Sequence, residues 1–307
     1  MTKNFQILMR SVISLAFIIL VAGPHAIAAQ NALTGDWTAS IVSDKSEKIN
    51  LSFERRTDKG SKNQMSTTYD FADLQGLSRE QVMSGGPVRF SLVREAGRID
   101  CEGNFQNGKG SGTFRFTGNQ SFVSEMKSRG FDFEQNSSSA NDGRDSEERL
   151  FAATTLNVTT ALADDLTSAG FGKLGVGDLF KAAIFKVDSK FMREMKGSGF
   201  PNLGMEELVK ARIFKIDADF VSQITRMGFD KESFESLIRM KIFKVTPEFI
   251  TEVRNEGLSN LSVEELVKMR IFKIDSEFIR QAKAEGVPLE VEKLVQRRIG
   301  ARSKSSN

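Results

Sequence analysis

The sequence predicts an α+β protein, in which an N-terminal antiparallel β domain (a sandwich or a small barrel) precedes an α-solenoid of about six helical hairpins. Three observations predict this class. Apolar and polar residues alternate in short runs over residues 33–118, which is the period of half-buried strands. From Phe122 onward the apolar period becomes helical. The helical part also repeats itself every 29 residues, as stacked repeats do.

Residues 1–29 are expected to be a secretory signal peptide. Lys3 and Arg10 give a positive start, Ser11 to Val21 is apolar but short, and Ala26-Ile27-Ala28 offers a cleavage site. The alternative is an N-terminal anchor that is not cleaved. No later segment is apolar for long enough to cross a membrane, so we expect no transmembrane segment after cleavage.

Composition removes much enzyme chemistry. The only histidine, His25, lies in the signal peptide, and Cys101 is the only cysteine. The exported chain therefore lacks a histidine base, a Ser-His triad, a zinc site of the usual ligands and an intramolecular disulfide. Two of the 43 basic residues lie in the signal peptide, leaving 41 against 40 acidic residues. This near-neutral balance argues against nucleic acid as a partner. We expect no cofactor, no metal and no enzyme.

The β domain is expected over residues 33–118. Its alternating runs are bounded by turn-formers such as Asp58-Lys59-Gly60 and Asn107-Gly108. One short helical turn is expected at Ser78 to Met83, capped by Ser78. The apolar residues of the three clearest strands are Ile49, Leu51 and Phe53; Val88, Phe90 and Leu92; and Phe114 and Phe116.

The 29-residue period is clearest in an Ile-Phe-Lys segment that occurs four times. Within one repeat, Thr246 is expected to cap a first helix, which ends near Gly257. Ser262 and Glu265 then form a capping box for a second helix. Each repeat is therefore predicted to be a hairpin of two short helices. The four copies are Ile184-Phe185-Lys186, Ile213-Phe214-Lys215, Ile242-Phe243-Lys244 and Ile271-Phe272-Lys273.

The repeat array is expected to cover residues 119–299, because Phe122, Met126 and Gly130 match the spacing of later repeats. A polar, low-complexity insertion at about residues 132–145 is predicted to be disordered. Residues 300–307 form a basic tail.

Two rows of basic residues are the candidate partner-binding residues, because one repeat position lines one surface of a solenoid. The first is a lysine ladder of Lys186, Lys215, Lys244 and Lys273, and the second row is Arg212, Lys241 and Arg270. The alternative is that these side chains are solvated or pair with Glu207, Glu235 or Glu265.

Other recurring residues are expected to be structural. The phenylalanines of each repeat have the spacing of core residues. Asp188, Asp217 and Asp275 are expected to cap helices and not to bind a cation, because Thr246 takes the same position. The acidic pairs Glu206-Glu207 and Glu264-Glu265 fall in first turns, where carboxylates favour the helix dipole.

The motifs resemble those of one group of bacterial envelope proteins. The repeat elements are Phe-x-x-x-Met-x-x-x-Gly-Phe, Glu-Leu-x-x-x-Arg-Ile-Phe and Val-Thr-Pro-Glu-Phe. They are similar to repeats in the extracytoplasmic region of beta-lactam-sensor-like membrane metallopeptidases and in anti-sigma-factor-like proteins. This sequence lacks a transmembrane bundle and the His-Glu-x-x-His motif, so the resemblance implies a sensor-like or scaffold role and not proteolysis.

These observations predict a periplasmic or secreted, non-enzymatic scaffold that binds a protein or peptide and is linked to envelope sensing or signalling. One alternative is a ligand-binding module, in which the β domain holds an apolar small molecule near Trp37. A third is a hydrolase that uses carboxylates alone, which needs two carboxyl groups facing each other across a cleft.

Overall fold

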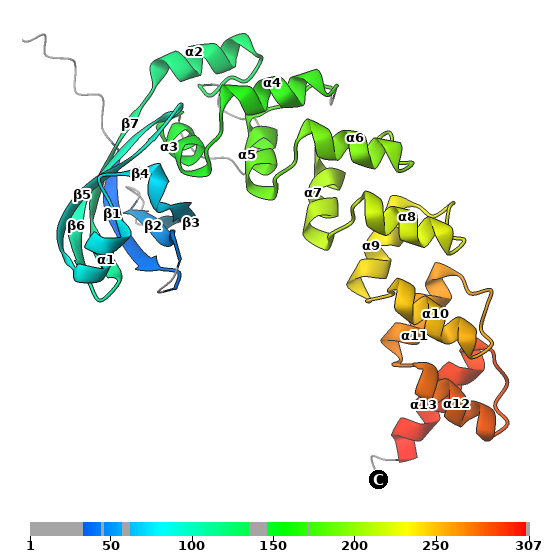
Figure 1. Cartoon of the computed structure of the whole chain (residues 1–307). Coiled ribbons are helices and arrows are strands. Elements are labelled where there is room, and N and C mark those ends of the chain that lie inside the picture. The colour runs from blue at the N-terminus through cyan, green and yellow to red at the C-terminus, as the bar shows by residue number, and fades with distance from the viewer. Residues whose placement is uncertain (1–32, 44–45, 57–61, 135–145, 171, 305–307) are drawn as a thin grey trace, which may run out of the picture. The chain divides into compact units, whose positions relative to one another are not determined.

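The computed structural model describes residues 33–43, 46–56, 62–134, 146–170 and 172–304. The expected signal peptide lies outside the described residues, as do most of the predicted disordered insertion and the end of the basic tail. The described part comprises a curled antiparallel sheet followed by helices, which confirms the α+β class (Figure 1).

The β domain is a single seven-stranded sheet with the order β3-β2-β1-β7-β6-β5-β4, and every neighbouring pair is antiparallel. Because β3 and β4 are its two edges, the sheet is an open half-barrel and neither the sandwich nor the closed barrel that we expected. The strands are β1 (Leu33–Ile41), β2 (Lys48–Arg56), β3 (Lys62–Asp70), β4 (Leu74–Gln75), β5 (Gly86–Arg94), β6 (Gly97–Gln106) and β7 (Lys109–Gly118).

The predicted alternation holds in these strands, since the apolar members of all three runs are buried on one face. Trp37 lies in this core at 1% exposure, in contact with the rings of Phe90 and Phe105. Asn107 and Gly108 both have positive φ and form the tight turn from β6 to β7. The short helix α1 (Arg79–Ser84) begins at Ser78, which is its cap as predicted.

A helix that follows the sheet in the chain covers the sheet in place of a second sheet. Helix α3 (Ser146–Leu156) contacts β3, β5, β6 and β7. The ring centroid of its Phe151 lies 5.7 Å from that of Phe53, 5.3 Å from that of Phe114 and 5.4 Å from that of Phe116. An apolar sheet face must be covered by another element. Here α3 covers it, so its residues 149–155 are all buried.

Twelve helices follow β7 in the described residues, and Figure 1 shows them in succession. Besides α3 they are α2 (Gln120–Ser128), α4 (Thr160–Ser168), α5 (Val176–Phe185), α6 (Ser189–Gly197), α7 (Met205–Phe214), α8 (Ala218–Arg226), α9 (Phe234–Ile242), α10 (Pro247–Asn255), α11 (Val263–Ile271), α12 (Ser276–Ala284) and α13 (Val291–Lys304).

Helices two apart in the chain pack against each other. Contacts join α3, α5, α7, α9, α11 and α13 in sequence, and we call these helices the odd row. The even-numbered helices also pack together, α2 on α4, α4 on α6, α6 on α8 and α10 on α12. Most helices therefore pack on the equivalent helix of the next repeat, and Arg254 of α10 donates a hydrogen bond to the carbonyl of Met227 after α8 at 2.7 Å. No helix of the described part is long and apolar enough to span a membrane.

The predicted caps are confirmed. The side chains of Asp188, Asp217, Thr246 and Asp275 each accept a hydrogen bond from the backbone N–H three residues later, at 2.7–3.2 Å. Ser262 and Glu265 form the predicted capping box at the start of α11. The aspartates are therefore helix caps, as their equivalence to Thr246 indicated.

Candidate binding surface on the odd row of helices

Five exposed isoleucines occupy the same position in successive members of the odd row. They are Ile184, Ile213, Ile242, Ile271 and Ile299, and each is 49–52% exposed. The last step is 28 residues, because the loop before α13 is one residue shorter. The other large apolar side chains exposed in the described residues are Val42, Met83 and Val93, which do not recur. The isoleucines therefore form a regular row and not scattered surface residues.

Helical geometry explains their exposure. Each α-helical residue advances about 100°, so Ile213 lies about 140° around α7 from the buried Leu208. The adjacent Phe214 is half-buried and packs on the core. The same arrangement recurs in α5, α9 and α11. The sequence contains this signal, because an isoleucine precedes the phenylalanine in each copy of the Ile-Phe-Lys segment.

The lysine ladder lies immediately beyond these isoleucines. Lys186, Lys215, Lys244 and Lys273 are all exposed. None has a carboxylate within 4.0 Å among the described residues, so they do not pair with Glu207, Glu235 or Glu265. Together the five isoleucines and four lysines make an apolar and basic strip along the odd row, which we call the ladder surface.

The ladder lysines have a left-handed backbone conformation, with φ between 54° and 57°. Glycine is the usual residue there, because any side chain adds a steric cost. The even-row helices follow this rule, since Gly199, Gly228 and Gly257 adopt positive φ after their ends. Lysine thus stands four times where glycine would be less strained. In the first repeat the equivalent residue is Asn157, with φ 56°.

The second basic row is engaged within the protein. Arg212 lies 3.7 Å from the ring centroid of Phe191, Lys241 lies 3.6 Å from that of Phe220, and Arg270 lies 4.8 Å from that of Phe249. Arg298 repeats the contact on Phe278 at 3.8 Å. Partial burial lowers the pKa of Lys241 below its usual value. These side chains join an odd-row helix to the even-row helix before it, so they are less available to a partner than the ladder lysines.

Ion pairs also join successive helices of the odd row. Lys181 pairs with Glu206, Arg239 with Glu264 at 2.9 Å, and Lys268 with Glu292. Sequence reasoning missed these pairs, because their members lie 24–25 residues apart in different helices. They engage Glu206 and Glu264, one residue of each acidic pair in a helix first turn. The other residues, Glu207 and Glu265, accept backbone hydrogen bonds at helix starts.

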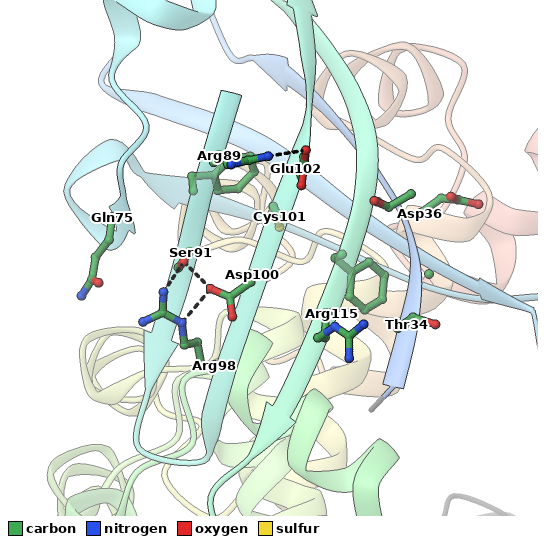
Figure 2. A pocket seen from close by; sticks show the side chains of 14 residues that line it. Thr34, Asp36, Gln75, Arg89, Ser91, Arg98, Asp100, Cys101, Glu102 and Arg115 are labelled. Carbon is green, nitrogen blue, oxygen red and sulfur yellow. Dashed lines mark hydrogen bonds and ion pairs between the residues drawn. The ribbon is translucent and has the colours of Figure 1, made fainter. Parts of the chain in front are cut away.

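A groove of about 750 Å³ lies on the sheet, lined by residues of β1, β4, β5, β6 and β7 (Figure 2). Arg89 pairs with Glu102 at 3.0 Å, while Asp100 accepts hydrogen bonds from Ser91 and Arg98 at 2.6 Å each. Three arginines and three carboxylates line the groove, so its charges balance. The buried Cys101 is 3% exposed, and desolvation raises the pKa of its thiol. The groove is lined by polar and apolar residues together and carries no excess charge that would select a ligand.

No match to the chain is found among protein-family models, curated proteins or solved structures. The resemblance of the repeats to bacterial envelope proteins therefore stays a prediction.

Proposed function

We propose that this protein is an exported, non-enzymatic scaffold whose repeats form an α-solenoid, and that the ladder surface of that solenoid binds a protein or peptide partner. The observation behind this proposal is the row of five half-exposed isoleucines beside four exposed lysines that pair with no carboxylate of the described residues. Apolar residues that gather on one protein surface mark interaction sites more often than singly exposed ones do. Backbone strain that recurs at one position is likewise typical of functional residues.

The solenoid is supported by the pattern of helix contacts. Each odd-row helix packs on the next odd-row helix, and ion pairs recur between them. Cation–π contacts recur between each odd-row helix from α7 to α13 and the even-row helix before it. A solenoid stacks equivalent elements in this way and presents one repeat position along one strip. The envelope location and the sensing or signalling role rest on the predicted signal peptide and on the resemblance of the repeats.

The alternative of an apolar ligand near Trp37 has less support. The indole is 1% exposed, and its Nε1 donates a hydrogen bond to the carbonyl of Glu102 at 3.2 Å. Phe90 and Phe105 cover its ring, so the side chain serves the core of the sheet.

The proposal is tested by affinity capture from an envelope extract. We expect the wild type to retain a partner that a Lys215→Glu, Lys244→Glu double variant loses. Lys231→Glu is the matched control, because Lys231 is exposed and lies before the start of α9, whereas Lys244 lies beyond its end. Equal recovery by the wild type and the double variant, or recovery of nothing by either, would count against a binding role of the ladder surface.

A further inference from the structure

The ladder surface specifies the chemistry of its partner. This inference rests on the proposed function and goes further by naming the kind of segment that binds. In each of four repeats the surface presents an exposed isoleucine and, two residues later, an exposed lysine. A segment that follows the row must therefore offer an apolar group and a negative charge to every repeat.

We infer that the partner segment is an acidic amphipathic α-helix lying along the ladder surface. Packed helices lie about 8–10 Å apart, so successive repeats present their isoleucines at about that spacing. Seven helical residues span about 10 Å and complete about two turns, which returns a side chain to the same face. A helix with a seven-residue pattern thus meets each repeat in the same way.

Extended conformations fit less well. Three residues of a β-strand also span about 10 Å, but successive third residues point to opposite faces. In a polyproline helix every third residue faces the same side at about 9 Å, yet this gives only one side chain to each repeat. An α-helix gives two or three side chains for every seven residues on one face, which is enough for both the isoleucine and the lysine.

The charges favour a protein segment over an anionic membrane. Asp188, Asp217 and Asp275 are exposed and lie two residues after ladder lysines. A continuous layer of lipid phosphates would meet these carboxylates as well as the lysines, and like charges repel. Individual carboxylates on a helix meet only the lysines, so a discrete acidic segment avoids that repulsion.

Selection from a random peptide library tests the inference. Displayed peptides of about 20 residues are long enough, as helices, to cover three repeats. We expect the purified protein to recover peptides in which apolar and acidic residues recur every seven positions and which become helical on binding. Affinity for a synthetic copy should fall about tenfold or more in two double variants, Ile213→Ser with Ile242→Ser and Lys215→Glu with Lys244→Glu.

Two controls keep the result decisive. Lys231→Glu should bind the peptide as the wild type does, and added salt should weaken binding by the wild type. All substituted side chains are exposed, and matching thermal unfolding curves will show that the variants fold.

The inference is overturned if the recovered peptides lack acidic residues, show no seven-residue pattern or bind both double variants unchanged. It is also overturned if only anionic phosphatidylglycerol vesicles, and no peptide, bind through the ladder surface. Should affinity capture still give a partner that depends on the ladder lysines, the proposed function stands and only the acidic helix is wrong.

Discussion

At the scale of single residues, the left-handed backbone conformation of the ladder lysines lowers the stability of the fold. A side chain in this conformation costs roughly 1–2 kcal/mol relative to glycine. A positive charge at a helix C-terminus stabilises the helix by about 0.3–1 kcal/mol through the helix dipole. This is less than the steric cost, so each ladder lysine is on balance destabilising. Lysine recurs at these positions despite that cost, and binding is the role that we propose for it.

The first prediction concerns Lys244. We expect Lys244→Gly to raise the free energy of unfolding by up to about 1 kcal/mol while weakening partner binding. Lys244→Val should instead lower the free energy of unfolding, because a β-branched residue tolerates positive φ poorly. Urea unfolding measures both effects. If the glycine variant were clearly less stable than the wild type, the lysine side chain would have a structural role that the contacts do not show.

A second residue-scale prediction concerns pH. Burial lowers the pKa of Lys241 in the folded state, whereas the unfolded chain keeps a value near 10.5. Between these two pKa values the unfolded state binds more protons, so the contribution of Lys241 to stability rises as pH increases through this window. We expect Lys241→Met to reduce that rise in unfolding experiments at alkaline pH up to 10.5. An unchanged pH dependence would show that the ammonium is fully solvated.

At the scale of elements, α3 covers the apolar face of the sheet. Phe151 is 7% exposed and contacts three rings of β2 and β7. We predict that Phe151→Ala lowers the free energy of unfolding by about 3–5 kcal/mol, as loss of a buried aromatic side chain does. Phe272→Ala is the comparison, because that ring is only half-buried and should cost less. A cost of under about 1 kcal/mol for Phe151→Ala would mean that the sheet is stable without α3.

The elements also show what the sequence could predict. The strands and the helix caps were predictable, because alternation and capping residues are encoded within a few neighbouring residues. The repeat was predictable because its segments recur every 29 residues. The cover provided by α3 was not predictable in this way. It depends on contacts between Phe151 and residues such as Phe53, about a hundred positions earlier in the chain. For the same reason the sheet was expected to close on itself or on a second sheet.

The candidate site was predicted in part. Repeat spacing identified both basic rows, but it could not separate the exposed lysines from the arginines that lie over phenylalanine rings. That difference arises from packing between consecutive helices. The isoleucine row could have been found by placing each repeat on a helical wheel, since Ile213 falls outside the buried face of α7.

At the scale of the whole molecule, a solenoid should tolerate the loss of one complete repeat. We predict that a protein without residues 218–246 still folds, because Asp217 then caps α10 in place of Thr246. Its helical circular dichroism should be weaker, because α8 and α9 are missing. Deleting residues 218–231 is the matched control, since it removes α8 alone and puts the later repeats out of phase. If both deletions unfold the protein, the helices form one cooperative body and the solenoid proposal fails.

Site-specific photo-cross-linking tests the binding role of the ladder surface most directly. A photoreactive residue is placed in turn at Ile213, Ile242 and Ile271, with Thr251 on α10 as an exposed control position. We predict that all three ladder positions give an adduct with the same envelope partner and that the control position gives none. Absence of any adduct at the three isoleucines, or equal adducts at Thr251, would contradict the account.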